Sequence, residues 1–290
     1  MILVTGSSGT VGRAVVNEVS KSGKPFKAMF RSEVEARKEQ GRMNTVIADF
    51  ADKDSLRRAL DTVQAIFVVC SPIPQLVELE SNVIEAARQS GVHHVVLNSA
   101  LGAEDYPKSF PSWHRQVENK LRASGLGYTI FRPNSFMQNI LAYSAPSIRA
   151  KNAFYAAVGG ARTSYLDVRD IAAVAAKALA SPSEHEGKIY ELNGPEAVSN
   201  AELAERISRV VSRPVQYVDI PEEAQRKAML DSGMPEWQVN ALLDLGRYYT
   251  GGKGGEVTNV LPTLLGRPPK SLDAFLEEFK DSFRSSAAGA

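Results

Sequence analysis

Cysteine is nearly absent from this chain of 290 residues. The single cysteine, Cys70, lies in the apolar run AIFVVC and has no partner for an internal disulfide. We therefore expect it to pack in the core of a protein from a reducing compartment. Long apolar runs are missing too: none approaches the roughly 20 residues that span a bilayer. The start, MILVTG, is not typical of a signal peptide. These absences predict a cytoplasmic protein.

An excess of one charge is also missing. Lys and Arg number 34, Asp and Glu number 33, and the formal net charge is +1. The basic residues are scattered along the chain, so neither nucleic acid nor a membrane surface is expected as a partner. The four histidines show no metal-ligand spacing with cysteine or with clustered carboxylates, and no metal is expected. These features favour a small molecule as the partner of a monomer or homodimer.

Short apolar runs alternate with amphipathic patterns over the first 133 residues. The runs do not alternate polar with apolar residues, which is typical of strands buried on both faces of a parallel sheet. Repeated βαβ units with right-handed crossovers form a doubly wound fold. We therefore predict an α/β Rossmann architecture. The predicted strands are ILVTG, FKAMFR, TVIADF, AIFVVCS, HVVLNSA and YTIFRP, and the predicted helices cover residues 11–22, 53–60, 75–90 and 112–125.

The pattern changes after Pro133. We predict a dinucleotide-binding core over residues 1–133 and, within the same compact unit, a mixed segment over 134–290. That segment completes the sheet and adds a smaller, α-rich, substrate-binding subdomain. The stretch AVGGARTSY predicts a pair of short strands, DVRDIAAVAAKALA a helix and KIYELNG a further strand. SNAELAERISRVV predicts a helix that Ser or Asn caps.

A glycine-rich loop, TGSSGTVG, joins the first predicted strand to the first helix. Gly6 permits a tight turn, Gly9 lets a pyrophosphate approach the backbone, and Gly12 lets the helix pack against the strand. Free N–H groups at the helix start favour an anion there. A strand before the loop and a helix after it are the context that a dinucleotide-binding motif requires. We expect Ser8, Thr10 and Val11 to share this contact.

The end of the second strand indicates which dinucleotide binds. Sites that prefer NAD place an acidic residue there for the ribose 2′-OH, whereas this strand ends in Arg31, whose guanidinium fits a 2′-phosphate. We therefore expect NADP(H) to be preferred over NAD(H), with Thr10, Ser32 and Arg37 as candidate helpers. The remaining expected contacts are Asp49 with the adenine amino group, Phe50 with the adenine ring, and Ser71 and Pro72 after the fourth strand.

Several stretches together resemble one family. ILVTGSSGTVG, SGLGYTIFRPNSFMQN, YLDVRDIAAVAAKAL and LLGRPPKSLDAFLEE occur in the order of the atypical short-chain dehydrogenase/reductases, in their NmrA-like branch. That branch includes triphenylmethane reductase, NADPH-dependent quinone reductases and redox-sensing regulators. The resemblance implies that Pro133 contacts the nicotinamide side of the cofactor, and that Asn134, Phe136 and Met137 contact the substrate.

The same resemblance exposes a departure. Ordinary members carry Tyr-x-x-x-Lys on the helix after the fifth strand, with the tyrosine as general acid. The matching positions here are His114 and Glu118, and Ser99 matches the partner serine. His114 and Ser99 are thus the candidate catalytic residues, and Ser99 also a cofactor contact. A histidine with an ordinary pKa near 6.5 suits proton donation near neutrality. Alternatively, His114 lines the pocket or forms a surface ion pair with Glu118.

Two functions remain open from the sequence. In the first, the protein is an oxidoreductase that transfers a hydride from NADPH to a quinone, a dye or an activated carbonyl compound, which needs little acid help. In the second, it binds NADP(H) without turnover and reports redox state, as NmrA-type regulators do. The missing tyrosine and lysine favour the sensor. The substrate-side residues after the sixth strand favour the reductase.

Overall fold

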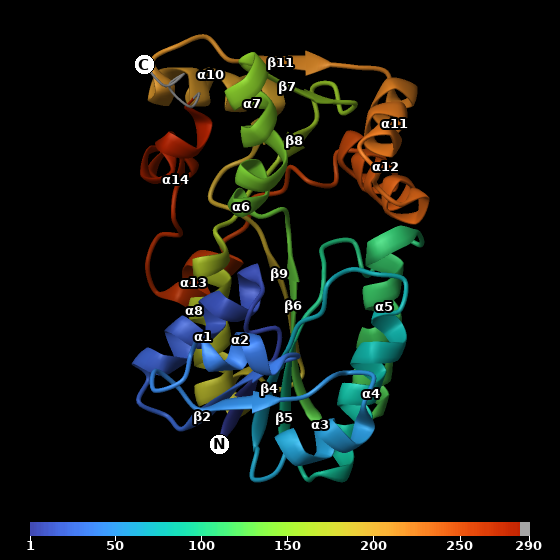
Figure 1. Ribbon diagram of the computed structural model, residues 1–290, viewed down its shortest axis with the longest axis vertical. Helices are drawn as coiled ribbons and strands as arrows, with labels where there is room; N and C mark the ends of the chain where they lie inside the picture. The colour runs from blue at the N-terminus through green and yellow to red at the C-terminus, as the bar shows by residue number, and fades with distance from the viewer. Residues whose placement is uncertain (285–290) are drawn as a thin grey trace. The chain divides into compact units, whose positions relative to one another are not determined.

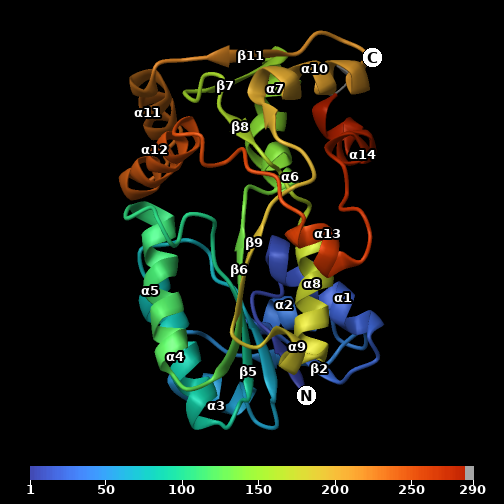
Figure 2. The same cartoon turned by 180° about the vertical axis from the view of Figure 1, so that it is seen from behind.

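The computed structural model describes residues 1–284, which form two compact units (Figures 1 and 2). The first unit contains Met1–Pro133 and Val168–Leu192. The second contains Asn134–Asp167 and the described chain from Asn193 onward. No helix within residues 1–284 is both long enough and apolar enough to cross a membrane.

A seven-stranded sheet forms the centre of the first unit. All its strands are parallel, in the order β3-β2-β1-β4-β5-β6-β9. The register places Leu3 of β1 opposite Ile66 of β4. The strands are β1 (Ile2–Val4), β2 (Phe26–Phe30), β3 (Thr45–Ile47), β4 (Ala65–Val68), β5 (His94–Asn98), β6 (Gly127–Pro133) and β9 (Lys188–Leu192).

Helices cover both faces of this sheet, which confirms the predicted doubly wound α/β fold. On one face α1 packs against α8, and on the other α4 packs between α3 and α5 (Figure 1). The helices of this unit are α1 (Thr10–Lys21), α2 (Glu33–Arg37), α3 (Lys53–Ala59), α4 (Leu76–Gln89), α5 (Ser109–Ala123), α8 (Val168–Ala180) and α9 (Pro182–His185).

The strand order reverses between β1 and β4. In a doubly wound sheet, ligands bind beyond the carboxyl ends of the strands at such a reversal. The chain after β1 is the glycine-rich loop, and the chain after β4 contains Ser71 and Pro72. Below them the core is fully buried: Leu3, Ile66 and Leu97 have no exposed surface. The sheet therefore supplies a rigid floor for a site at this edge.

The second unit is mostly helical. Helix α10 begins with the predicted cap: the Ser199 hydroxyl accepts the N–H of Glu202, whose carboxylate accepts the N–H of Ser199. The helices are α6 (Met137–Asn139), the π-helical turn η1 (Ile140–Ser144), α7 (Ala145–Lys151), α10 (Asn200–Val211), α11 (Glu222–Asp231), α12 (Glu236–Thr250), α13 (Val260–Leu265), α14 (Leu272–Glu278) and the 3-10 turn η2 (Lys280–Phe283).

Two small sheets complete this unit and correct one prediction. The stretch AVGGARTSY does not form a strand pair. Strand β7 (Ala153–Ala156) ends before it and pairs with β11 (Gln216–Asp219), while β8 (Arg162–Thr163) pairs with β10 (Val198–Ser199). Partners distant in sequence replace the predicted local hairpin.

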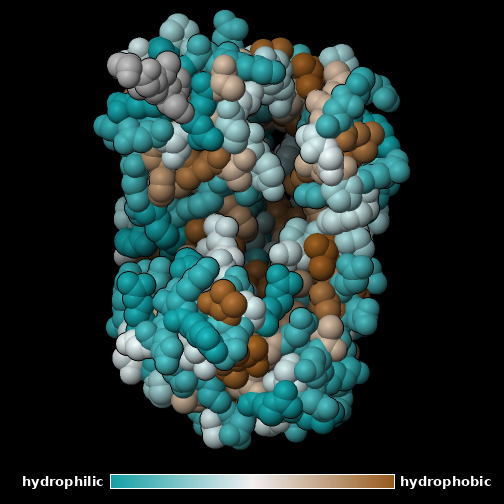
Figure 3. All heavy atoms as spheres, viewed as in Figure 1, coloured by the Kyte–Doolittle hydropathy of each residue, from teal (hydrophilic) through white to brown (hydrophobic). Residues whose placement is uncertain are grey.

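Large exposed apolar side chains are few in the described chain. Figure 3 shows small hydrophobic patches among hydrophilic atoms on the face it presents. Among the large exposed hydrophobic residues of the described chain, Val34 is 68% and Tyr143 65% exposed. Single exposed apolar residues of this kind are ordinary and need no partner to cover them.

Candidate functional site

The glycine-rich loop has the geometry that its sequence predicts. Gly6 adopts a left-handed conformation with φ of +60°, and a Cβ atom there would lie 2.8 Å from Cγ1 of Val69. A Cβ atom on Gly12 would lie 2.2 Å from the carbonyl oxygen of Gly6. Only glycine fits at position 12 without moving the backbone, because helix α1 begins directly against the turn.

The start of α1 offers unsatisfied donors. Gly9 is the N-cap and no side chain caps the helix. The Gly9 N–H bonds to the carbonyl of Gly6, but within residues 1–284 the N–H groups of Thr10, Val11 and Gly12 have no acceptor. Ser8, Gly9 and Thr10 are exposed. Donors at the positive end of a 12-residue helix, beside glycine backbone, can hold a phosphate.

Arg31 is exposed at the end of β2, and no hydrogen bond or ion pair engages it within the described chain. The two proposed helpers differ. Ser32 caps α2 by accepting the N–H of Glu35, and Arg37 pairs with Glu33 at 2.8 Å. Arg31 is therefore the available guanidinium in this stretch.

Charged residues after β2 and β3 act on the thiol of Cys70, which follows β4. Burial raises the pKa of the Cys70 thiol to about 12; Asp49 also raises it, and Arg31 lowers it. The Asp49 carboxylate is exposed and accepts the N–H of Ala51. Phe50 is 9% exposed and belongs to the main core, so little of its surface is open to a ligand.

A buried ion pair lies beside Ser99, and the sequence analysis did not predict it. Glu118 of α5 accepts the Nε–H of Arg132 at 3.0 Å and its Nη2–H at 2.6 Å. The Ser99 hydroxyl, directly after β5, donates to Oε1 of Glu118 at 2.5 Å. All three residues are at most 5% exposed. An arginine inside the buried run YTIFRP requires a carboxylate partner, and that signal was available in the sequence.

Two partly exposed carboxylates extend this pair. The Glu104 carboxylate lies 2.7 Å from the Arg132 guanidinium, and the Glu191 carboxylate lies 3.6 Å from it. Burial lowers the pKa of Arg132, but the hydrogen bonds that it donates to Glu118 and Glu104 outweigh burial, and the net change in its pKa is upward. Arg132 in turn holds the pKa of Glu104 below its usual value. The arginine therefore stays charged at any physiological pH.

His114 does not form the surface ion pair that is one of its predicted roles. It is 5% exposed, so a surface pair with Glu118 is wrong, and Glu118 is engaged by Arg132 and Ser99 instead. Its Nδ1 is buried and has no hydrogen-bond partner within residues 1–284. Burial lowers the pKa of His114 to about 4. With this pKa little of the ring is protonated near neutrality, and a catalytic role for His114 stays a prediction.

The predicted substrate residues divide into three cases. The Asn134 amide donates to Ser164, Asn193 and the carbonyl of Gly254, so its amide hydrogens are engaged within the second unit. Met137 has no exposed surface and packs in that unit's core, so the prediction that it contacts substrate is wrong. Phe136 is partly exposed.

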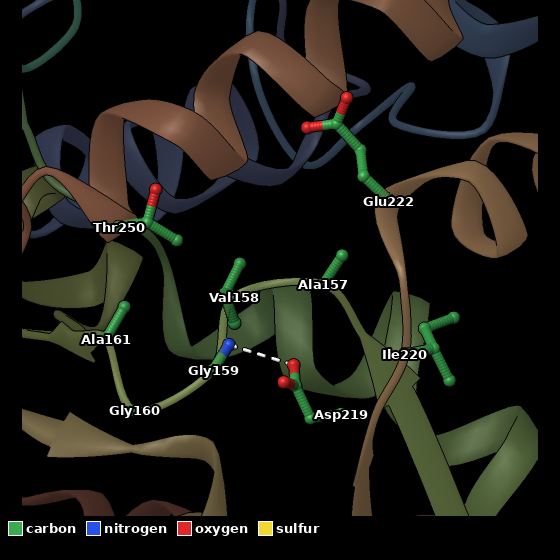
Figure 4. A pocket seen from close by; sticks show the side chains of 9 residues that line it. All are labelled: Ala157, Val158, Gly159, Gly160, Ala161, Asp219, Ile220, Glu222 and Thr250. Carbon is green, nitrogen blue, oxygen red and sulfur yellow. Dashed lines mark hydrogen bonds between the residues drawn. The ribbon is translucent and has the colours of Figure 1, made fainter.

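The second unit contains a shallow hollow of about 430 Å³ between the β7–β8 turn, the end of β11 and the end of α12 (Figure 4). The Gly159 N–H donates to Asp219 at 2.9 Å on its wall. An adjoining hollow is lined by Tyr249, Gly252 and Gly255. None of the three predicted substrate residues lines either hollow. Asn134 contributes indirectly, because its bond to Gly254 anchors the loop that does.

Comparison with known proteins agrees with this geometry. The model of the NmrA-like family matches residues 1–259. The NAD(P)H azoreductase of Xenophilus azovorans is 36% identical over 98% of this chain and 99% of its own.

Solved structures give the same result. An NADPH-dependent quinone oxidoreductase from Escherichia coli, in complex with NADPH, superposes with a TM-score of 0.88 at 28% identity, over 96% of this chain and 99% of the other. The triphenylmethane reductase of Citrobacter sp., complexed with NADP(H), has a TM-score of 0.86 over 96% of this chain and 99% of the other. Its 21% identity supports the fold alone.

Proposed function

The chain belongs to the NmrA-like family, and on that premise we propose that it is an NADPH-dependent reductase of conjugated electrophiles such as quinones and dyes. The observation that carries the proposal is the glycine-rich loop with its unsatisfied N–H groups at the start of α1. Gly12 lets α1 begin directly against the turn, and exposed Gly9 leaves the backbone open to a pyrophosphate. The dinucleotide, when bound, supplies a hydride.

Arg31 supports NADPH over NADH. Its guanidinium is exposed at the end of β2, where an acidic side chain would be needed for a ribose 2′-OH. A guanidinium can hold a 2′-phosphate by two charged hydrogen bonds. Ser8, Thr10 and Val11 complete the proposed phosphate contact. Exposed Asp49 follows β3, exposed Ser71 and Pro72 follow β4, and Pro133 ends β6.

The substrate class follows from what the site's own residues supply. His114 is neutral at pH 7, and the hydroxyl hydrogen of Ser99 is donated to Glu118. Neither residue therefore provides a strong acid, and the matching positions lack the tyrosine and lysine of ordinary members. Quinones and cationic conjugated dyes accept a hydride without concerted proton donation. The relatives named for quinones and azo compounds support the same class.

The test is a titration of NADPH and NADH followed by turnover. Loss of a charge-assisted hydrogen bond costs about 1.5–3 kcal/mol, so Arg31→Ala should weaken NADPH binding roughly ten- to a hundredfold and leave NADH binding unchanged. Arg37→Ala removes a guanidinium already paired with Glu33 and is the matched control. Equal affinities of the parent for both dinucleotides would overturn the assignment.

Turnover separates the reductase from the redox sensor. NADPH absorbance should decrease with quinones and cationic dyes in the presence of the parent protein. NADPH binding without oxidation by any member of a panel of quinones, dyes and carbonyl compounds would instead support the sensor.

A further inference from the structure

The hydrogen bond between Ser99 and Glu118 has only one possible direction. Glu118 already accepts two N–H groups from the Arg132 guanidinium, which has no acceptor atoms of its own. A carboxylate in such a pair can only accept, so the Ser99 hydroxyl must be the donor. A serine has one hydroxyl hydrogen, and here it is used inside the protein.

The Ser99 hydroxyl can therefore offer a ligand only the lone pairs of its oxygen, and no hydrogen. It follows directly after β5, at the carboxyl edge of the sheet, and its backbone N–H is bonded to the carbonyl of Phe131. Its oxygen can accept a hydrogen bond from an amide or a hydroxyl. It cannot donate to a substrate oxygen unless the buried bond to Glu118 breaks.

We propose that Glu118 and Arg132 are positioning residues that hold Ser99 as a hydrogen-bond acceptor for an amide or hydroxyl group of the bound dinucleotide. This inference rests on the proposed function. Ser99 then orients the cofactor and is not the proton source of the reaction. Arg132 holds Glu118 by two hydrogen bonds, and Glu118 fixes the orientation of the Ser99 hydroxyl. With its hydrogen directed at Glu118, the hydroxyl can bind only a ligand group that donates a hydrogen bond.

Burial makes this arrangement rigid. Ser99 is 3%, Glu118 1% and Arg132 5% exposed, so water does not compete for these bonds. Removing one member of a buried ion pair leaves the other charge uncompensated. Exposed Glu104 and Glu191 keep Arg132 partly compensated when Glu118 is altered, which allows a variant of Glu118 to fold.

The first test compares Ser99→Ala with Ser99→Thr. Loss of one accepted hydrogen bond should weaken NADPH binding roughly three- to tenfold in Ser99→Ala, and Ser99→Thr should restore it. A solvent deuterium isotope effect on the turnover number at saturating NADPH should be the same in parent and Ser99→Ala. Thr129→Val, which removes another buried hydroxyl bonded to His94, is the control for stability alone and should leave NADPH affinity unchanged.

The second test addresses the positioning residues. Glu118→Gln can donate as well as accept, so it no longer fixes the direction of the Ser99 bond, and Arg132→Lys keeps the charge but loses the two-pronged contact. Both should weaken NADPH binding about as much as Ser99→Ala, and adding Ser99→Ala to Glu118→Gln should weaken it no further. Thermal denaturation checks that each variant is folded.

The opposite result is equally definite. A 10²–10⁴-fold lower turnover number in Ser99→Ala, with unchanged NADPH affinity and a lost solvent isotope effect, would make Ser99 a proton donor and overturn the inference. Full affinity in a folded Glu118→Gln would also overturn it. Failure of the parent to bind NADPH would instead refute the proposed function, so the two failures are distinguishable.

Discussion

Replacement of His114 tests the assignment of a neutral, buried imidazole. We propose the variants His114→Leu and His114→Gln, neither of which titrates. Burial lowers the pKa of His114 from 6.5 to about 4. Between these values the unfolded chain binds a proton that the folded chain does not, so stability rises with pH and is lost as pH falls through this window.

The size of the effect follows from the two pKa values. One pKa unit corresponds to about 1.4 kcal/mol, so the parent should lose about 2 kcal/mol of unfolding free energy between pH 7 and pH 5 through His114 alone, and roughly 3 kcal/mol in the limit below pH 4. Neither variant should show this loss. Any pH-independent cost of the substitution cancels when each variant is compared with itself at two pH values.

Urea denaturation of parent and variants at pH 5, 6 and 7, without added dinucleotide, measures the difference. If His114→Leu and His114→Gln show the same pH dependence of the free energy of unfolding, the difference from the parent comes from titration and not from the loss of a polar ring. Parallel pH dependences in all three proteins would show that His114 titrates as an exposed histidine and would refute the argument. If the turnover rate of the parent fell as pH rose through 6.5, and this decrease were absent in His114→Gln, the imidazolium would be the proton donor after all.

Three further predictions follow from burial and close contact. Glu80, fully buried, has a pKa that burial raises to about 8, while the Cys70 amide lowers it slightly without reaching hydrogen-bond geometry. The folded state then holds a proton that the unfolded state releases as pH rises. In urea denaturation the free energy of unfolding of the parent should therefore fall by roughly 2–3 kcal/mol between pH 5 and 7, and that of Glu80→Gln should not. Equal decreases in the two proteins would contradict this. Gly12→Ala should abolish NADPH binding in a protein with normal circular dichroism, whereas Gly160→Ala, with open space around its Cβ, should bind normally. Asn134→Ala removes the amide that donates to Ser164, Asn193 and Gly254, although Ser164 still donates to the other two. It should lower the free energy of unfolding by about 1 kcal/mol and speed proteolysis within 250–256, unlike Asn139→Ala; an unchanged melting temperature would refute this role.

The sequence by itself determined the local elements of the sheet and the place of the glycine-rich loop. The central strands β1, β4 and β5 are runs of residues buried on both faces, and helices α1 and α4 each have one buried apolar stripe. The cap of α10 is likewise a local pattern. These predictions succeed because neighbours in sequence create the signal.

The two-stranded sheets of the second unit show where that signal ends. Strand β7 finds its partner about 60 positions later in β11, so the pairing is set by packing and not by a turn. Similarly, Met137 occurs in a stretch that resembles a substrate contact, yet its side chain is fully buried in the core of its unit.

Tertiary structure alone decided the chemistry beside β5. His114 and Glu118 are four residues apart on one helix and in the sequence resemble a pair, but the structure joins Glu118 to Arg132 of β6 and to Ser99 after β5. That joining requires three elements to pack side by side, and packing also excludes the water that would keep the pKa of His114 near 6.5. The charge state of His114 depends on its burial, and the direction of the Ser99 hydrogen bond depends on partners distant in sequence. A linear sequence pattern contains neither the burial nor those partners.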